Sequence, residues 1–330
     1  MFNSDTDPAV SDLTSVHVAC AADAGYVKPL AAMLHSLLAN AGPRNAVYVH
    51  VLDGGIHDAD KTLIAELCRA GGGTVHWVPV QDSRFPGAPL WGRMSVSTYY
   101  KLLLGERLPS DLTKVIWLDC DLVVVGDIGR LWEEGLGGHH ALAARDAVVP
   151  VISSRSGVAG WRELGIDAES AYFNAGVMVI DLTLWRSDRV GERALEYVRR
   201  HRDRVYFWDQ EGLNAVLAGR WRELDARWNH NVSVPDAARR HAGGASDAWI
   251  VQFAGNLKPW RYVVRNTPHE LYYRHLDMTP WKGWRPPWSP FSSLVAVYER
   301  LGFRSVLYPL EKWWMRALRA MTKRTAGPDT

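Results

Sequence analysis

Apolar runs alternate with segments of helical periodicity through the first half of the chain. The runs at 15 to 22, 46 to 53 and 74 to 80 are rich in β-branched residues and have the length of strands. Between them, the segments at 27 to 42 and 58 to 73 carry apolar residues at helical spacing and stop at glycine. Strands separated by single helices predict a largely parallel sheet, in which ligands bind at the carboxyl ends of the strands.

The pattern is less regular in the second half. A short helix is expected at 97 to 109 and a buried strand at 114 to 125. The later elements that the pattern predicts are strands at 139 to 147, 172 to 182 and 249 to 255, and helices at 181 to 203 and 209 to 219. Beyond Trp260 the chain is rich in Trp, Pro and Arg, which indicates an irregular segment packed by aromatic rings. The predicted fold class is α/β with a mostly parallel central sheet.

The run VIWLDCDLVVV, at 115 to 125, places two carboxylates inside a segment otherwise suited to a buried strand. A buried carboxylate without a partner costs several kcal/mol or takes up a proton, so Asp119 and Asp121 need a positive charge. Lys114 lies just outside the apolar run, and no basic residue follows until Arg130. We therefore expect the compensating charge to come from outside the protein, with a metal ion as the candidate.

Composition and charge narrow the classes of protein. A chain of 330 residues with 47% hydrophobic and 22% charged residues has the composition of a globular protein, and its net charge of +2 gives no argument for nucleic-acid binding. Its three cysteines lack metal-ligand spacing and favour free thiols in a reducing compartment. The N-terminus is acidic, so we expect no signal peptide, and no run of about 18 uncharged apolar residues predicts a membrane span.

Three interpretations of the Asp119-Cys120-Asp121 pattern remain open at this point. Carboxylates two residues apart converge on one hard cation only if the strand ends or bends there, which would make a metal-diphosphate site. A phosphatase with the first aspartate as nucleophile is a rival, although its later motifs cannot be placed. The plainest alternative is a pair of residues that cap loops at a strand end.

Several longer motifs carry a resemblance that favours the first interpretation. They are CAADAGY (20 to 26), RMSVSTYYKLLLGERLP (93 to 109), VIWLDCDLVVVGDIGRLW (115 to 132), YFNAGVMVIDLTLWR (172 to 186), DQEGLN (209 to 214) and FAGNLKPW (253 to 260). In this order they resemble the family 8 glycosyltransferases, most closely bacterial lipooligosaccharide galactosyl- and glucosyltransferases. The resemblance covers residues 15 to 262 and implies a GT-A (Rossmann-like) fold, a UDP-sugar donor, a divalent cation and retention of anomeric configuration.

The resemblance also assigns the nucleotide site. The residues that it places around uracil are Ala21, Ala22, Asp23 and Tyr26. Tyr26 can stack on the base, and Asp23 can accept a hydrogen bond from the imide N–H. Arg93 would pair with phosphate or sugar oxygens of the donor.

For the diphosphate, the resemblance implies that Asp119 and Asp121 hold the bridging cation, with Cys120 between them in the donor site. Gly255 would permit close backbone approach to phosphate, and Lys258 would supply a point charge for the leaving UDP. A packed turn is the alternative for this Lys-Pro-Trp loop.

The sugar side of the site involves a second group of residues. Those implied to hold hydroxyls of the donor sugar or to border the reacting carbon are Asp146, Asn174, Asp209 and Gln210. Gln210 is a poor nucleophile, so attack on the face that UDP leaves is the preferred route to retention, and Asp209 is the candidate for a covalent alternative.

Two positions depart from the family pattern. Gln252 stands where related enzymes place a metal-binding histidine, so we expect Gln252 to bind the cation weakly or to favour Mg²⁺ over Mn²⁺, unless His241 substitutes. Gly25 replaces a position that is frequently polar. Gln252 is also the main argument for a second function class, a protein that binds nucleotide-sugar or glycan without turnover. An oxidoreductase is a distant third, because no Gly-x-Gly-x-x-Gly follows the first strand.

The expected organisation is a flexible N-terminus at 1 to 14, a catalytic domain at 15 to 262 and a C-terminal extension at 263 to 330. In LEKWWMRALRAMTKR, apolar and basic residues fall on separate helical faces, which predicts either contact with an anionic membrane surface or a helix packed on the domain. We therefore expect a cytoplasmic enzyme, peripheral to the inner face of the membrane, that moves galactose or glucose to a glycan or lipid-linked glycan.

Overall fold

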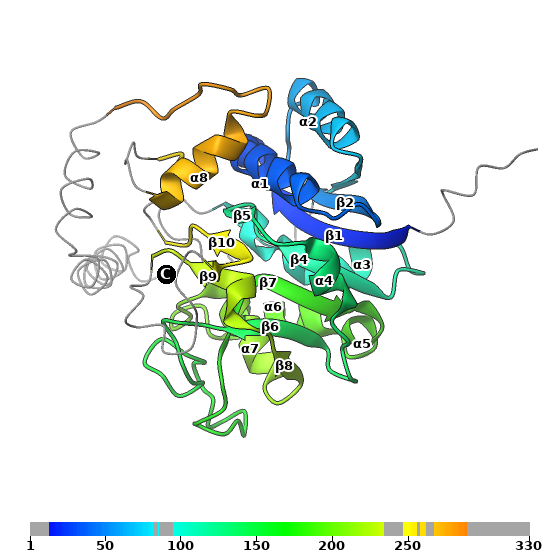
Figure 1. Cartoon of the computed structure of the whole chain (residues 1–330). Helices are drawn as coiled ribbons and strands as arrows, with labels where there is room; N and C mark the ends of the chain where they lie inside the picture. Colours follow the sequence, from blue (N-terminus) through cyan, green and yellow to red (C-terminus); the bar gives the residue numbers. More distant parts are fainter. Residues whose placement is uncertain are drawn as a thin grey trace, which may run out of the picture.

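A seven-stranded sheet forms the centre of the molecule, with strand order β3-β2-β1-β4-β7-β6-β8 (Figure 1). The structure is a computed structural model, and it describes residues 13–81, 85, 95–233, 247–255, 258–261 and 267–288. The strands are β1 (Thr14–Ala22), β2 (Asn45–Asp53), β3 (Thr74–Pro79), β4 (Lys114–Leu118), β6 (Ala141–Arg145), β7 (Phe173–Asp181) and β8 (Trp221–Glu223). Only β7 runs antiparallel to its neighbours β4 and β6, which confirms the expected mostly parallel sheet.

Helices cover both faces of this sheet because its strands are apolar on both sides. On one face, β1 residues such as Val16 and Val18 pack with Leu30 and Leu34 of α1 (Val27–Ala39). α2 (Asp58–Ala70) lies beside α1 on the same face. The other face packs against the 3₁₀ helix η2 (Val96–Leu103), α6 (Val190–Arg200) and α7 (Trp208–Leu217).

A second, three-stranded sheet stands beside the first. It is made by β5 (Leu122–Val124), β10 (Ile250–Gln252) and β9 (His230–Asn231), with β10 in the middle. β5 and β10 are antiparallel, and β10 is parallel to β9. The run at 114 to 125 is therefore not one strand: β4 ends at Leu118 in the large sheet, and β5 begins at Leu122 in the small one.

Two predicted helices are also divided. The segment at 181 to 203 forms α5 (Leu182–Ser187) and α6, because Arg189 between them is left-handed with φ 52°. Asp188 at this break accepts hydrogen bonds from the His140 ring and the Arg220 guanidinium. The segment at 97 to 109 forms η2 followed by the short α3 (Leu104–Arg107).

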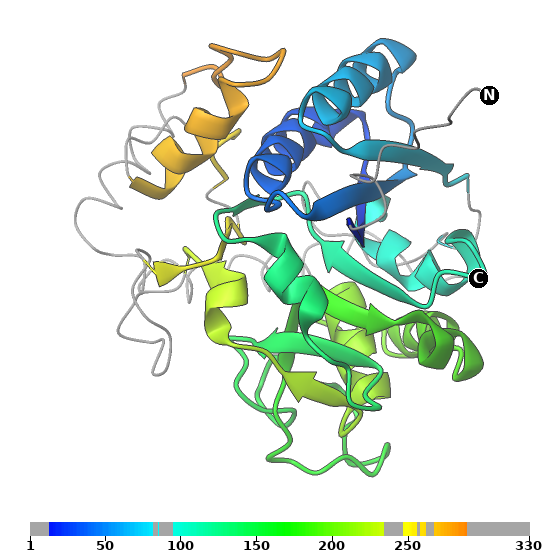
Figure 2. The same ribbon diagram turned by 45° about the vertical axis from the view of Figure 1, so that its right-hand side comes forward.

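The remaining elements connect the two sheets and cover them. They are η1 (Ala24–Tyr26), α4 (Ile128–Glu133), η3 (Ala226–Asn229) and α8 (Thr267–Leu276). α8 packs along α1 in both views, beside the small sheet (Figures 1 and 2). The basic segment predicted near the C-terminus lies outside the described residues, and the division into three parts stays a prediction. None of the helices in the described ranges is long and apolar enough to cross a membrane.

Candidate active site

Asp119 and Asp121 lie in the bend where the chain passes from the large sheet to the small one. The Asp119 N–H donates to the carbonyl of Gly176 on β7 at 2.8 Å, and the Phe253 N–H donates to the carbonyl of Asp121 at 2.7 Å. These bonds fix the two aspartates to different sheets. Both aspartates therefore lie in the irregular segment between β4 and β5, a break in the strand that convergence on one ligand requires.

The charge that compensates the aspartates comes from two lysines, contrary to our expectation that none of the protein's own cations reaches them. Lys101 Nζ, on η2, lies 3.1 Å from Asp119 Oδ1 and 2.8 Å from Asp209 Oδ2. Lys258 forms an ion pair with Asp121 Oδ2. Both lysines are buried, with exposed fractions of 3% and 7%, and so is Asp209, whereas the side chains of Asp119 and Asp121 remain partly exposed.

Sequence reasoning missed Lys101 altogether. It lies in the apolar stretch TYYKLLLG, where a basic residue inside a buried pattern is itself a signal that a carboxylate must be near. The Lys101 ammonium also donates to the Ala175 carbonyl at 3.1 Å and lies 5.3 Å from the centre of the Trp117 ring. Lys101 thus ties η2 to β4, β7 and α7 at one point.

Gln252, at the end of β10, bridges the two aspartates. Its Nε2 donates to Asp119 Oδ2 at 3.3 Å and to Asp121 Oδ1 at 3.1 Å. Its Oε1 is buried and has no hydrogen-bond partner. Gly176 makes room for this amide, because a Cβ at Gly176 would collide with it.

Burial and charge act in opposite directions on the two carboxyls. Burial raises the pKa of Asp119, and the nearby Asp121 and Asp209 carboxylates raise it further, against the opposing effect of Lys101. Burial also acts to raise the pKa of Asp121, but Lys258, Gln252 and Lys101 outweigh it and lower that pKa. Asp121 is therefore stabilised in its ionised form, whereas Asp119 takes up a proton more readily.

A second cluster surrounds Asp146, beyond the end of β6. Asp146 Oδ2 accepts hydrogen bonds from Asn174 Nδ2 at 3.0 Å and from Gln210 Nε2 at 3.1 Å. Its Oδ1 accepts the backbone N–H groups of Val148 and Val149 at 2.8 and 2.9 Å. The hydrogen-bond donors to the Asp146 carboxylate are thus side-chain amides and backbone N–H groups.

α7 joins the two clusters. Its residue Asp209 is paired with Lys101 and accepts from Thr98 Oγ1 at 3.0 Å, whereas the next residue, Gln210, belongs to the Asp146 cluster. Gln210 Oε1 accepts the Ala175 N–H at 3.0 Å, so both ends of this amide are held. Trp208, just before Asp209, has φ 45°, a left-handed conformation that non-glycine residues rarely adopt and that is frequent at functional sites.

The residues expected around uracil follow the end of β1. Asp23 caps η1, its Oδ1 accepting the Gly25 N–H at 2.8 Å, so this oxygen is already engaged. Tyr26 meets Trp260 edge to face at 5.7 Å between ring centres. Burial raises the pKa of Tyr26, and the negative charge of Asp121 raises it further.

Three other expected features have separate outcomes. Cys120 points toward β1, where its Sγ donates to the carbonyl of Ala21 at 3.1 Å. Gly255 has φ 82°, so glycine is required at this position for its backbone conformation. Arg93 and His241 lie outside the described residues, and their predicted roles stay predictions.

The seven-stranded, mostly parallel sheet with helices on both faces is the architecture of the GT-A glycosyltransferases among the solved structures that this chain resembles. Residues 17–263 match the model of the family described as Glycosyl transferase family 8. The chain belongs to this family.

Relatives of known name agree with this assignment. The chain is 26% identical over 278 residues to General stress protein A of Bacillus subtilis (strain 168), covering 81% of this chain and 94% of that protein. It is 24% identical over 274 residues to the lipopolysaccharide 1,2-glucosyltransferase of Escherichia coli (strain K12), covering 81% and 79%. The crystal structure of galactosyltransferase LgtC in complex with donor and acceptor sugar analogs is similar with a TM-score of 0.69 and 27% identity, over 81% of this chain and 96% of that one.

Proposed function

We propose that the protein transfers a hexose, galactose or glucose, from a UDP-sugar to a hydroxyl of a glycan, with retention of anomeric configuration. The observation that carries this proposal is the arrangement of the two clusters, which the consecutive residues Asp209 and Gln210 of α7 join. One cluster holds carboxylates against buried lysines, which suits a cation and a diphosphate. The other holds amides and a carboxylate in fixed positions, which suits the hydroxyls of one sugar ring.

The residues present fit a hard divalent cation. Asp119, Asp121 and the unpartnered Oε1 of Gln252 are all oxygen ligands, of the kind that Mg²⁺ and Mn²⁺ bind. The amide presents its N–H groups to the aspartates, so a half-turn of the amide would bring Oε1 to the same place. When bound, a cation at this position would neutralise charge on the diphosphate. The described residues contain no group of three or more His, Cys, Asp or Glu side chains that could hold a metal, so a cation here would depend on the Gln252 amide in addition to the two aspartates.

Lys258 has the position and the reach to stabilise the departing UDP. Its ammonium rests on Asp121 and lies 5.6 Å from the centre of the Trp260 ring. A lysine side chain can move between neighbouring anions, so Lys258 would exchange the Asp121 carboxylate for a phosphate oxygen of the donor. A positive charge at that oxygen lowers the barrier because negative charge develops there as the glycosidic bond breaks.

Retention is best explained by attack on the face from which UDP leaves. Gln210 is held at both ends, by Asp146 and by the Ala175 N–H, so its amide can line the sugar but is a poor nucleophile. Asp209 is paired with Lys101 and bonded to Thr98, which lowers its nucleophilicity as well. The pairings of Asp209 therefore weigh against a covalent intermediate.

The proposed acceptor is a glycan or a lipid-linked glycan, as in the synthesis of lipopolysaccharide. This part of the proposal rests on the two relatives whose names describe a lipopolysaccharide glucosyltransferase and a galactosyltransferase. Galactose and glucose differ only in the orientation of one hydroxyl group, so the donor sugar has to be identified by measurement.

Calorimetric titration with UDP in Mn²⁺, Mg²⁺ or EDTA, followed by release of UDP from UDP-glucose and UDP-galactose, tests the proposal. We expect cation-dependent binding and slow hydrolysis of one donor. Asp121→Ala should abolish both, whereas Asp58→Ala, which removes a fully exposed carboxylate from its ion pair with Lys61 on α2, should change neither. If UDP binds equally well in EDTA and neither UDP-sugar is hydrolysed, the result would instead favour a protein that binds nucleotide-sugar without turnover.

A further inference from the structure

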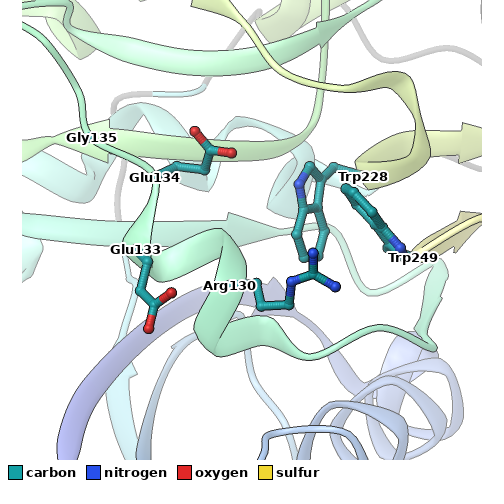
Figure 3. Close-up of a pocket in the computed structure, with 6 residues that line it drawn as sticks. All are labelled: Arg130, Glu133, Glu134, Gly135, Trp228 and Trp249. Carbon is teal, nitrogen blue, oxygen red and sulfur yellow. The ribbon is translucent and has the colours of Figure 1, made fainter.

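A hollow of about 340 Å³ lies at the other end of the small sheet from the aspartates (Figure 3). β5 and β10 run antiparallel, so Asp121 and Gln252 mark one end of the ribbon, and Val125 and Trp249 mark the other. The hollow is bounded by the end of α4, the turn that follows it, and the indoles of Trp228 and Trp249. Its volume is at the lower end of the range for small-molecule sites.

The two indoles form a rigid wall. Their ring centres are 4.7 Å apart at an interplanar angle of 55°, and Trp228 is only 2% exposed. The Trp249 carbonyl accepts the N–H groups of both Val125 and Gly126 at 2.8 Å. A Cβ at Gly126 would come within 2.8 Å of the Trp249 side chain, so glycine permits this close packing. The Arg227 guanidinium also lies over Trp249, 3.9 Å from the ring centre, so the aromatic surface left for a ligand is the remaining part of the partly exposed Trp249 ring.

Donors and acceptors surround this aromatic wall. The Arg130 guanidinium lies 5.2 Å from the centre of the Trp249 ring, beside both indoles in Figure 3, and it forms no ion pair with any described carboxylate. Glu134 lies across the hollow, where its Oε2 accepts from Arg222 Nη2 at 3.3 Å. Glu133 is exposed on the rim and likewise has no cationic partner in the described ranges.

This combination selects one class of ligand. The carboxylates of Glu133 and Glu134 are matched by the guanidiniums of Arg130 and Arg222, so the rim carries no net charge that would select a phosphate or another anion. The charged rim disfavours a purely apolar ligand, because its charges would lose water without gaining partners. A neutral pyranose ring offers apolar C–H groups to the indoles and hydroxyls that can both donate to the carboxylates and accept from the guanidinium.

We infer that this hollow is a second saccharide site, which binds a neutral hexose unit of a glycan away from the reacting end. The choice of ligand rests on the proposed function, because a glycan transferase meets its polymer at more than one sugar. The hollow itself shares no residue with either carboxylate cluster. Binding here would hold the acceptor glycan at the enzyme without touching the donor.

The indole ¹H–¹⁵N spectrum of the full chain tests the inference, with lactose, maltotriose and cellotriose as probes at millimolar concentration. Trp249→Phe identifies the Trp249 resonance. We expect at least one probe to shift it in a saturable manner, and Arg130→Gln or Glu134→Gln to weaken that binding roughly tenfold. Arg69→Gln, an exposed change on α2, is the matched control and should leave the binding constant unaltered.

Two further measurements separate this inference from the proposed function. The oligosaccharide-dependent shift should survive in Asp121→Asn, which removes the donor site, and Arg130→Gln should leave UDP-sugar hydrolysis unchanged. If no probe shifts the Trp249 resonance, or if the shift disappears in Asp121→Asn, the second site does not exist. If UDP fails to bind while the shift remains, the proposed function is wrong and the saccharide site stands.

Discussion

The two carboxylate clusters beside α7 compensate the negative charge of their aspartates in different ways. Asp209 is buried, and Asp119 and Asp121 are partly exposed; all three are paired with the ammonium groups of Lys101 or Lys258. Asp146 is also buried, but its partners are two side-chain amides and two backbone N–H groups. A lysine can leave one anion for another, whereas backbone N–H groups cannot move. The ion-paired cluster is therefore suited to exchange partners with an incoming ligand, and the amide cluster to hold a fixed geometry.

Lys101→Met is the change with the largest expected effect, because it leaves the buried Asp209 and the partly exposed Asp119 without a cation. Methionine keeps most of the packing of the stem, so the loss is mainly electrostatic. We expect the free energy of unfolding in urea to fall by about 3–5 kcal/mol. Arg145→Met, which breaks the exposed ion pair with Glu223, should cost less than about 1 kcal/mol. Equal losses would show that the Lys101 pairs are no more important than a surface ion pair.

Asparagine at position 121 and at position 146 should separate the two clusters functionally. Asp121→Asn should weaken cation-dependent UDP binding by roughly a hundredfold, because it removes a charged ligand. Asp146→Asn places an amide N–H against the donors of Asn174 and Gln210, so sugar transfer should fall roughly a hundredfold while UDP affinity stays the same. Calorimetry with UDP and a UDP-release assay measure the two effects. A loss of UDP affinity in Asp146→Asn would mean that the clusters act as one site.

Lys258→Met tests whether the ion-paired cluster exchanges partners. Without the ammonium, Asp121 is free for a cation, so Mn²⁺ titrated into the protein alone should bind roughly tenfold more tightly. UDP should bind roughly tenfold more weakly, because Lys258 no longer meets its phosphate. Electron paramagnetic resonance of free Mn²⁺ and calorimetry with UDP measure the two directions, with the exposed Lys282→Met as control. Weaker binding of both ligands would contradict the exchange.

The smallest expected effect concerns pH and checks that the carboxylates stay charged. His50 is buried on β2, and burial together with His17 and His76 lowers its pKa to about 4. Because the unfolded chain binds a proton near pH 6.5 and the folded one does not, stability is lost as pH falls below that value. From about pH 8 to about pH 6 we expect His50 to contribute a loss of roughly 0.8 kcal/mol in urea unfolding, so the total loss should be smaller by that amount in His50→Gln. The loss that remains is expected from His275, whose pKa burial also lowers to about 4. Proton uptake by Asp119, whose pKa is raised, has the opposite sign, so a gain of stability as pH falls in His50→Gln would weaken the contrast between the clusters.

Much of the architecture could be predicted from the sequence because its elements have strong local signals. The β-branched runs at β1, β2 and β7 and the glycine stops after α1 and α2 define the sheet and its helices. The break at Arg189 could not be foreseen, because an arginine in a left-handed conformation has no signature in the sequence. Its cause is tertiary, in the bonds that Asp188 makes with His140 and Arg220.

The candidate site was only partly predictable, for a related reason. Asp119, Asp121, Gln210 and Lys258 could be named because they occur in recognisable motifs. Lys101 could not, because its partners are distant in the chain and meet only when η2 packs on the large sheet. The interpretation of the aspartates as lacking any partner in the protein failed because it considered charges near in sequence rather than near in space.

The division of the aspartate pair between two sheets has a mechanical consequence. Asp119 follows the last residue of β4 and Asp121 precedes the first residue of β5, so the gap between their carboxylates depends on the angle between the sheets. A ligand bound to both carboxylates would hold the two sheets at one angle, and any tilt of one sheet against the other would weaken the binding of that ligand. The bend between β4 and β5 therefore couples ligand binding to the relative orientation of the two sheets.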